Sequence, residues 1–546
     1  MPDTASTSTQ TVASSAVLVS TLFAVDKVLG VVRDAAISRA FGASAALDAY
    51  YAAFELPDAL FNVIAGLALS TALIPVLAAH TRRGEPGRAE AWRLASTVIN
   101  WALLLITVAG IVAAVFAREV IIAVAPGFEP ERVSLATGLM RLVLLQTVLA
   151  SISGIVMSVL HAHQHFLLPA AAPIAYTLGR IGGALLLAPR FGIYGLALGG
   201  LAGTVGHFLV QVPGLIRFGA RWSPKLHHSD LATILRLMGP RVLGLGVTYI
   251  SFVLPTYFGS RLAAGAISSY EYAWRLMQFP ETIIGTALGL TVFPTLAQQA
   301  DVGDRQGMRK TAGWALRLMM ALAIPAAVGL LVLGQPLTAL FLQRGAFDAA
   351  ATARVYRALQ AFALGLITHS ALEVLSRLFY AQRDMWTPLW AAIAGLGANL
   401  LLSQLLLSQL EHVGLALANS IGVGVQVGIL QAVARRRLRP AATDVAAPSG
   451  GAGTGFAASI ARSLLVSALM GGAILAFRHS QPGARLPMAA IGGVMVGGST
   501  FLVAAALFGP QELRDLSRQL MGKLGSQASG AGQSNVGRPD AESSDA

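Results

Sequence analysis

The chain matches itself at one fixed offset in three separate places. The first match pairs Pro75 with Pro294, and 294 − 75 = 219. Around these prolines the same offset pairs Gly66, Ala68, Leu69, Leu77 and Ala78 with Gly285, Ala287, Leu288, Leu296 and Ala297. It also pairs Pro169 with Pro388, and the run from Gly195 to Leu198 with the run from Gly414 to Leu417. A constant offset over this length indicates two similarly built lobes with no net insertion between them.

Long uncharged runs indicate a membrane protein. Of the 546 residues, 55% are hydrophobic and 12% are charged, whereas a soluble domain carries about 25% charged residues. A helix of roughly 20 apolar residues crosses the ~30 Å hydrocarbon layer. The runs between charged or Pro/Gly breaks predict about fourteen spans, which start near Ser15, Ala46, Ser96, Val133, Leu168, Ile193, Leu231, Gly265, Ala315, Thr352, Leu389, Val413, Phe456 and Leu486. We therefore predict an all-α polytopic membrane protein.

The predicted spans divide into two lobes and a final pair. The first twelve form two sets of six, and the last two stand outside the repeat. Because each lobe has an even number of spans, both have the same orientation and the repeat is parallel, about an axis along the membrane normal. We predict an N-terminal tail at 1–14, an N-lobe at 15–228, a C-lobe at 229–439, a linker at 440–455, the final pair at 456–510 and a partly disordered tail at 511–546.

Basic residues predict the orientation of the chain. They gather in the loops that follow even-numbered spans, namely Arg82, Arg83, Arg88 and Arg93, then Arg217, Arg221 and Lys225, then Arg305, Arg309 and Lys310, then Arg435, Arg436, Arg437 and Arg439. Because cytoplasmic loops carry an excess of Lys and Arg, we expect both termini in the cytoplasm. Two like lobes in a membrane chain are typical of transporters that bind their cargo at the repeat interface.

Several other function classes are disfavoured. The net charge of +13 is spread among loops and helix interiors without a nucleic-acid motif, so we expect no nucleic-acid partner. The lack of cysteine excludes disulfides and thiolate metal sites. The chain has no GxxxxGK[ST] pattern for ATP and no nucleophile-base-acid set, so we expect no cofactor and no enzyme. His161, His163 and His165 resemble metal ligands in spacing, but a solvated loop is the favoured interpretation.

Ionisable residues inside predicted spans are the candidate functional residues, because each is costly in lipid unless it faces a cavity or a partner. The first span carries Asp26, Lys27, Arg33, Asp34 and Arg39. A seven-residue spacing places Asp26 beside the Arg33 stripe and Lys27 beside the Asp34 stripe. A helix this polar should line an aqueous interior.

Other spans carry charges at helical spacing. In the second span Asp48, Tyr51, Glu55 and Asp58 share one face, and the carboxylates could pair with the first span or bind a cation. The seventh and eighth spans hold Arg241, Arg261, Glu271, Arg275 and Gln278, and the tenth holds the i, i+4 pair Glu373 and Arg377.

Two arginines lie deep in their runs and in opposite lobes. We expect Arg33 and Arg275 to line a cavity and to bind an anion, since a guanidinium grips phosphate through two hydrogen bonds and an ammonium cannot. Interhelical salt bridges are the alternative for both. Near the ends of spans we favour salt bridges, or side chains that extend to the membrane interface, for Arg39, Asp48, Arg261 and Arg377.

Short motifs carry a family resemblance. They lie at residues 27–34, 41–42, 48–57, 275–280, 343–347 and 379–388. Together they resemble the signatures of the MurJ/MviN family of lipid II flippases, and the similarity extends from roughly Ser15 to Leu438.

The resemblance implies a fold and a function. The expected fold is two six-helix lobes in a V, with the final pair at 456–510 forming a groove for a lipid tail. The family moves lipid II, an undecaprenyl-pyrophosphate-linked disaccharide pentapeptide, from the inner to the outer leaflet of the bacterial cytoplasmic membrane for peptidoglycan synthesis. The implied partners are lipid II, membrane lipids and the cell-wall synthesis machinery. The family's cavity arginines fall on Arg33 and Arg275, and its acidic position at the start of the second helix falls on Asp48.

The chain departs from the family pattern at three places. It has Phe61-Asn62 where a basic residue is usual, Gln278 where a carboxylate is usual, and Lys27 where an arginine is usual. We expect Lys27 and Arg241 to supplement Arg33 and Arg275 on the phosphates. The residues to which we assign gating or ion pairing are Asp34, Asp48, Glu55, Glu271, Gln278, Glu373 and Arg377.

The expected mechanism is alternating access, driven by a coupling cation or by the membrane potential. Three other functions stay open: a flippase for another polyprenyl-pyrophosphate-linked oligosaccharide, a cation-coupled drug exporter, and a non-transporting scaffold of the cell-wall machinery. A drug exporter should have a cavity dominated by carboxylates and aromatic rings. A scaffold should not depend on Arg33 or Arg275.

Overall fold

The computed structural model describes residues 4–64, 67–81, 84–439, 452–481 and 486–514. Within these ranges the chain is nearly all helical and contains no strand. Helices satisfy their own backbone N–H and C=O groups, which the hydrocarbon layer requires of any spanning segment. The all-α prediction is therefore confirmed. Most of the predicted linker at 440–455 and of the predicted tail at 511–546 lies outside the described residues.

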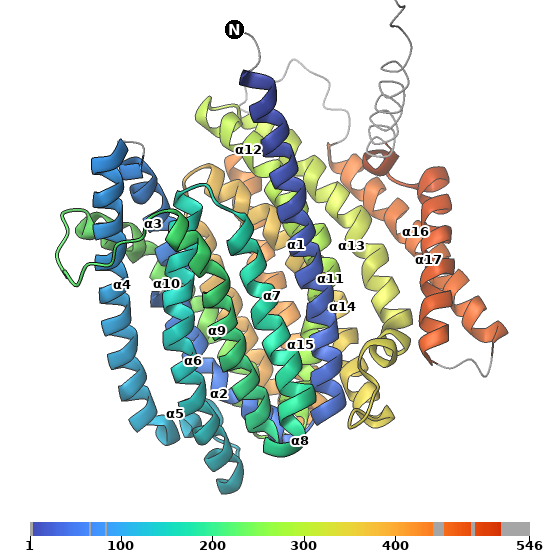
Figure 1. The fold of residues 1–546 in the computed structure, drawn as a ribbon. Coiled ribbons are helices and arrows are strands. Elements are labelled where there is room, and N and C mark those ends of the chain that lie inside the picture. The colour runs from blue at the N-terminus through green and yellow to red at the C-terminus, as the bar shows by residue number, and fades with distance from the viewer. Residues whose placement is uncertain (1–3, 65–66, 82–83, 440–451, 482–485, 515–546) are drawn as a thin grey trace, which may run out of the picture. The chain divides into compact units, whose positions relative to one another are not determined.

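The helices follow one another in chain order with short connections (Figure 1). Up to residue 217 they are α1 Thr4–Phe41, α2 Ala45–Ile64, α3 Leu67–Thr81, α4 Gly84–Val115, α5 Ala117–Val124, α6 Pro130–Ala162, α7 Leu167–Gly182, the π-helical turn η1 Gly183–Leu187, α8 Ala188–Phe191 and α9 Ile193–Arg217. From residue 231 they are α10 Leu231–Gly259, α11 Ala266–Glu281, the π-helical turn η2 Thr282–Thr286, α12 Ala287–Asp301, α13 Arg305–Leu342, α14 Ala349–Ala381, α15 Trp386–Arg437, α16 Ala452–Ser480 and α17 Leu486–Phe508.

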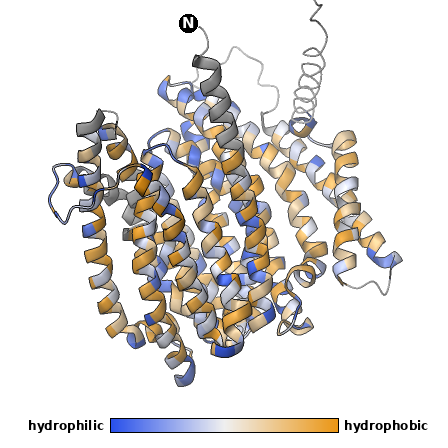
Figure 2. Cartoon of the chain, viewed as in Figure 1, coloured by the Kyte–Doolittle hydropathy of each residue, from blue (hydrophilic) through white to orange (hydrophobic). Residues whose placement is uncertain are grey.

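Among the described residues, ten helical stretches are long and apolar enough to cross a membrane. Figure 2 shows hydrophobic residues along most of their length, while hydrophilic residues gather at helix ends and in connections. These stretches confirm a multi-pass membrane protein. The number of fourteen spans stays a prediction.

The sequence repeat extends to the backbone. Gly192 and Glu411 are one offset apart, since 411 − 192 = 219. Their dihedral angles nearly coincide, with φ 56° and ψ −139° at Gly192 and φ 49° and ψ −134° at Glu411. Gln164 and Arg383, separated by the same offset, have φ of 57° and 59°. Positive φ is uncommon outside glycine, so its recurrence at both pairs reflects the repeat. Glu411 also divides α15 into two helices, two residues before the predicted span start at Val413.

The chain forms two compact units. The first unit consists of Met1–Leu276, Gln335–Phe362 and Leu389–Gln426, and the second unit consists of Met277–Gly334, Ala363–Pro388 and Val427–Ala546. Each unit therefore draws segments from both halves of the sequence. The lobe boundaries that we place at 228/229 and 439/440 stay predictions.

Facing glycines bring α7 and α9 together in the first unit. A Cβ on Gly179 would lie 2.7 Å from the carbonyl oxygen of Gly199, and a Cβ on Gly203 would lie 2.6 Å from the carbonyl oxygen of Tyr176. Side chains at these positions would force the helices apart. Small residues are the usual means of close helix packing in lipid, where no hydrophobic force drives helices together. This contact fixes the position of α7, which carries a buried arginine described below.

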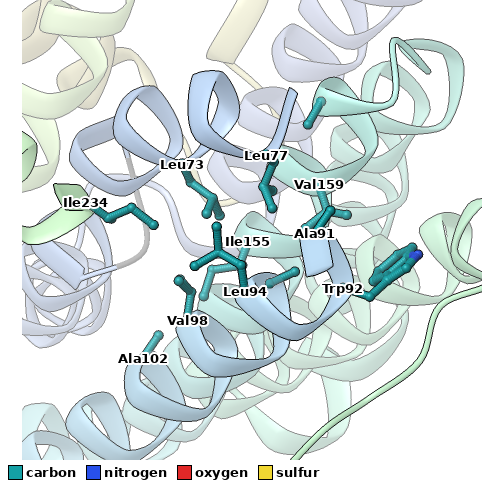
Figure 3. Packing of buried hydrophobic residues seen from close by; sticks show 12 residues of the cluster. Leu73, Leu77, Ala91, Trp92, Leu94, Val98, Ala102, Ile155, Val159 and Ile234 are labelled. Atoms are coloured by element: carbon teal, nitrogen blue, oxygen red, sulfur yellow. The ribbon is translucent and has the colours of Figure 1, made fainter. Parts of the chain in front are cut away.

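A hydrophobic cluster in the same unit joins α3, α4 and α6. Its buried members, several of them labelled in Figure 3, include Leu73, Leu77, Leu94, Val98, Ile155, Val159 and Ile234. Ile234 belongs to α10, so the cluster also attaches the helix that opens the second half of the sequence. The partly buried Phe61 packs against this cluster. Phe61 thus has a packing role at the position where a basic residue is usual in the family that the chain resembles.

An extended segment, residues 218–230, connects α9 to α10 and lies beside α4; we call it the strap (Figure 1). Side chains of α4 donate hydrogen bonds to its carbonyl oxygens: Trp92 Nε1 to Phe218 at 3.1 Å, Asn100 Nδ2 to Ser223 at 2.8 Å and Trp101 Nε1 to Leu226 at 2.7 Å. Its far end is held by the contacts His80 Nε2 to Asp230 Oδ2 at 2.7 Å and His228 Nε2 to Glu90 Oε1 at 3.0 Å. The strap is therefore fixed to α3 and α4 at both ends.

Candidate functional site

Two arginines from distant parts of the sequence share one carboxylate oxygen. Arg33 of α1 donates to Asp34 Oδ1 from both Nε and Nη2, each at 2.9 Å. Arg275 of α11 donates to the same oxygen from Nη1 at 3.1 Å. The three side chains are 21%, 17% and 24% exposed for Arg33, Asp34 and Arg275, so they are largely but not completely removed from solvent. Arg33 and Arg275 therefore lie close together within the first unit, while their role in lining a cavity and binding an anion stays a prediction.

Arg275 has two further partners. Glu271, one turn earlier on α11, places Oε2 at 3.7 Å from Arg275 Nη2. The guanidinium carbon also lies 5.1 Å from the centre of the Tyr51 ring, which is a cation–π distance. Tyr51 belongs to the face of α2 that the sequence singles out. Arg275 is thus held by two carboxylates and one aromatic ring, which together fix its orientation.

A third arginine, Arg180 of α7, belongs to the same charged cluster. It is 9% exposed, and its guanidinium carbon lies 5.8 Å from the Tyr50 ring centre and 5.9 Å from that of Tyr176. Its positive charge acts on both Arg33 and Arg275. Our sequence interpretation missed Arg180, although a charge inside the fifth predicted span is a candidate by the same rule that selected Arg33.

Several buried polar atoms around this cluster lack a hydrogen-bond partner among the described residues. They are the hydroxyls of Tyr50, Tyr51 and Tyr272 and the Nε atom of Arg180. Buried polar groups in folded proteins are almost always satisfied, so unsatisfied groups that gather at one place point to water or a ligand. With Arg33, Arg180 and Arg275 nearby, the cluster is suited to a ligand that carries negative charge and accepts hydrogen bonds.

Asp48 fixes the start of the helix that carries Arg275. Its carboxylate is 1% exposed and accepts hydrogen bonds from the backbone N–H groups of Gly265 at 2.7 Å and Ser268 at 2.8 Å. These groups lie at the N-terminal end of α11, where N–H groups lack partners within the helix and favour a negative charge. Asp48 thus bonds backbone amides where we had favoured a salt bridge. Its role in gating stays a prediction.

The remaining predicted residues of the first unit lie in different settings. Glu55 accepts a hydrogen bond from the Thr256 hydroxyl of α10. Asp26 accepts one from the Thr177 hydroxyl at 3.0 Å, while Arg33 bonds its neighbour Asp34, so the proposed seven-residue pairing is not formed. Lys27 is exposed. The side chain of Arg241 lies outside the described residues.

The second unit contains the other predicted residues. Glu373 and Arg377 of α14 form an ion pair, and Arg377 Nη1 also donates to the Glu373 carbonyl at 2.9 Å. Gln278 is exposed. Their assignment to gating or ion pairing stays a prediction.

Asp384, in the loop between α14 and α15 of this unit, is bonded by several donors. It accepts hydrogen bonds from Thr387 Oγ1 at 2.6 Å, from Thr387 N at 2.9 Å and from Arg437 Nη1 at 2.6 Å. Burial raises the pKa of Asp384, but the hydrogen bonds from Thr387 and Arg437 outweigh burial and hold it below the ordinary value. The carboxylate is therefore charged at neutral pH.

The three spaced histidines form aromatic contacts. The His163 ring stacks on Trp92 at 5.5 Å and lies 4.8 Å from the Phe218 ring, while His161 packs against Phe166 at 5.5 Å. Burial, with the positive charge of Arg217, lowers the pKa of His165. These contacts explain the histidines as packing residues at the end of α6.

Comparison with known proteins identifies the family. The model of the family described as lipid II flippase MurJ matches residues 37–491. A lipid II flippase MurJ of Burkholderia cenocepacia is 34% identical over 409 residues, which cover 73% of this chain and 78% of the relative. Arg33 and Asp34 precede the residues that the family model matches, so their assignment depends on the geometry above.

Solved structures agree on the fold. A structure of lipid II flippase MurJ in an inward closed conformation has a TM-score of 0.75 at 24% identity and covers 92% of this chain and 99% of its own. An inward-facing multidrug resistance MATE family transporter of the MOP superfamily has a TM-score of 0.63 at 15% identity, with 77% and 96% covered. The chain therefore belongs to the lipid II flippase MurJ family, whose members are transporters and not enzymes.

Proposed function

We propose that the chain moves lipid II from the inner to the outer leaflet of the bacterial cytoplasmic membrane, with both termini in the cytoplasm. The observation that supports this most directly is the convergence of Arg33 and Arg275 on one oxygen of Asp34. The two arginines come from α1 and α11, one from each half of the sequence repeat. Family membership supplies the identity of the cargo, and the arginine pair supplies the chemistry that a pyrophosphate needs.

The cargo has a charged headgroup that cannot cross hydrocarbon unaided, because removing its charge from water costs many kcal/mol. Guanidinium groups replace lost water with charge-assisted hydrogen bonds in a geometry that matches phosphate oxygens. In the proposed site Arg33 and Arg275 contact the pyrophosphate. Arg180 adds a third positive charge and a free Nε donor. The tyrosine hydroxyls of the cluster are available for the sugar.

Asp34 would act as an internal competitor of the cargo. Three donor contacts meet on one of its oxygens, so the carboxylate keeps two like charges close together. A pyrophosphate that enters must displace it. This exchange lowers the net affinity of the site for the pyrophosphate. A transporter needs a cargo affinity that differs between its inward-open and outward-open conformations, because a cargo bound equally tightly by both does not change their populations.

Alternating access is the mechanism that we infer. The membrane potential is worth about 2.3 kcal/mol per charge per 100 mV and, with the interior negative, favours outward movement of an anion and inward return of a cationic site. A coupling cation at Asp48 or Glu55 is the other source of energy. Asp48 is occupied by two backbone amides and Glu55 by one hydroxyl, so Glu55 keeps more acceptor capacity for a cation.

A flippase for another polyprenyl-pyrophosphate-linked oligosaccharide is the second candidate, since the same arginines would serve it. A drug exporter fits less well, because three arginines lie in the cluster beside the carboxylates and aromatic rings. A scaffold gives no reason for unsatisfied polar atoms next to the buried Arg180 and the partly buried Arg33 and Arg275.

The test is rescue of a bacterium depleted of its own flippase, with the appearance of labelled lipid II at the outer leaflet as the readout. We expect the parent chain to restore growth and labelling, and Arg33→Ala and Arg275→Ala to restore neither. Arg261→Ala is the matched control, because Arg261 is exposed at the end of α10 and its guanidinium contacts the Tyr257 ring at 4.7 Å. Normal lipid II labelling with both Arg33→Ala and Arg275→Ala would refute the proposal. Transport of another polyprenyl-linked oligosaccharide without rescue would establish the second candidate.

A further inference from the structure

The second unit contains a cavity at the ends of α12, α13, α14 and α15. Its volume is about 820 Å³, which falls within the ~300–1,000 Å³ of typical small-molecule sites. It is lined by Ala300, Asp301, Gly303, Arg305, Met308, Ala381, Gln382, Arg383, Arg436, Arg437 and Leu438. Four of these residues are arginines and one is an aspartate. The loops that contribute them belong to the set that the basic-residue pattern assigns to the cytoplasm.

Two of the arginines are held in place. Arg437 donates to Asp384 at 2.6 Å and to the Thr387 hydroxyl at 3.1 Å, and its guanidinium carbon lies 5.5 Å from the Phe379 ring centre. Arg383 Nη2 lies 3.3 Å from Asp301 Oδ1. The backbone of Arg383 has a φ of 59°, a conformation that Gln164 shares in the first repeat.

The other two arginines, Arg305 and Arg436, are exposed and carry no ion pair within the described part of the chain. Asp301 and Asp384 compensate two of the four positive charges around the cavity. Two positive charges therefore face the cavity without an acidic partner from the described residues.

The sequence repeat offers an internal comparison. At the corresponding positions of the first repeat, 219 residues earlier, His163 stands for Gln382, Phe218 for Arg437 and Trp92 for Thr311. There the His163 ring stacks between Trp92 and Phe218, with ring centres 5.5 Å and 4.8 Å away. The first repeat thus has aromatic rings in contact at the positions that correspond to Gln382 and Arg437, two residues that line the cavity of the second repeat. The lining Arg436 has a counterpart in Arg217, so the two repeats differ in part of this region and agree in another.

We propose that this cavity binds a phosphate-bearing anion. Guanidinium groups match phosphate oxygens in geometry. Arg305 and Arg436 supply the hydrogen-bond donors and two positive charges, while the charges of Arg383 and Arg437 are compensated by Asp301 and Asp384. The phosphates can belong to an anionic lipid headgroup or to a soluble diphosphate. Basic pockets at the cytoplasmic ends of membrane helices are a common setting for the first source. The site is separate from Arg33 and Arg275, which belong to the first unit.

A local fluorescent label tests the proposal in the full chain. The chain has no cysteine, so Met385→Cys provides one attachment point beside the cavity at a side chain that is 57% exposed and is not part of the lining. The labelled protein is placed in nanodiscs of phosphatidylcholine alone or with phosphatidylglycerol. Inorganic pyrophosphate is then titrated into the phosphatidylcholine sample. We expect a saturable signal from pyrophosphate, from phosphatidylglycerol or from both, and the probe that gives it identifies the source.

Two variants and one control decide the result. Arg305→Ala/Arg436→Ala should weaken the response by at least about tenfold, since each charge-assisted contact is worth a factor of ten or more. Gln382→Trp should weaken it without changing any charge, because the larger ring takes up space at the lining. Arg309→Ala/Lys310→Ala removes the same number of charges from α13, outside the lining, and should change the response less than about twofold. An equal loss in the control pair, or no response to either probe, would overturn the proposal.

Discussion

Replacing Asp34 by asparagine is the most direct test of how the arginine pair is held. Asparagine keeps the size of the side chain and removes its charge. The three donor contacts on Asp34 Oδ1, at 2.9, 2.9 and 3.1 Å, then become hydrogen bonds to a neutral oxygen. A hydrogen bond to a charged group contributes about 1.5–3 kcal/mol and a neutral one about 0.5–1.5, so each contact loses roughly 1 kcal/mol.

The expected loss is therefore about 3 kcal/mol before solvent is considered, and about 2 kcal/mol after it, because the side chains are 17–24% exposed. Repulsion between Arg33 and Arg275 adds to this loss. The free energy of unfolding should be measured in one detergent at one salt concentration. The same variant should bind pyrophosphate about tenfold more tightly, since its competitor has lost its charge, while transport of lipid II falls.

Asp26→Asn is the matched control for this experiment, since it removes the same charge from the same helix at a residue bonded to Thr177. The titrations use a chain that also carries Arg305→Ala and Arg436→Ala, so that the cavity of the second unit does not contribute. We expect no gain in pyrophosphate affinity for Asp26→Asn. If Asp34→Asn binds pyrophosphate no more tightly than its parent, Asp34 does not compete with the ligand and the reasoning fails.

Three further outcomes follow from the structure. Gly192→Ala should destabilise the protein by about 1–3 kcal/mol through backbone strain alone, because a Cβ there meets nothing within 4 Å. Glu411→Gly should relieve the same strain at the matching position and stabilise the protein by about 1 kcal/mol. Thermal unfolding of both variants measures these changes. Because the pKa of Asp384 is lowered, the carboxylate contributes its full stabilisation above the ordinary carboxyl pKa of about 3.9 and loses it as the pH falls through the lowered value. The unfolding midpoints of the parent and of Asp384→Asn should therefore differ at pH 7 and converge in strong acid. Arg180→Met, which keeps the packing stem and removes the charge, should reduce lipid II transport without preventing folding, and a fully active variant would remove Arg180 from the site.

The class of the protein and two members of its charged cluster can be predicted from the sequence because they follow from local patterns. Apolar runs require membrane helices, and a charge deep in such a run requires a partner or a cavity, which selects Arg33 and Arg275. The pairing within the site cannot be predicted in this way. Helical spacing favours contacts at i+3, i+4 and i+7, yet Arg33 bonds the adjacent Asp34, because a long flexible guanidinium reaches a neighbour whose own direction differs.

Other features depend on contacts between distant parts of the chain. Asp48 bonds two amides more than 200 residues away, so no periodicity in the sequence could identify its partners. Arg180 was overlooked for a different reason: it stands alone in a glycine-rich run, without a second charge at helical spacing. Its importance becomes visible only when α7 packs on α9 and places it beside Tyr50.

Between residues 218 and 226 the strap is held mainly through its main chain. The hydrogen bonds that Trp92, Asn100 and Trp101 donate to it end on carbonyl oxygens, atoms that all residues possess, and Trp222 adds a side-chain bond to Asn100 Oδ1 at 3.0 Å. Substitutions along 218–226 outside Trp222 can therefore preserve this attachment, while the donors on α4 cannot change without losing it. Among homologues, we accordingly expect residues of the strap to vary more than the hydrogen-bond donors of α4 that hold it.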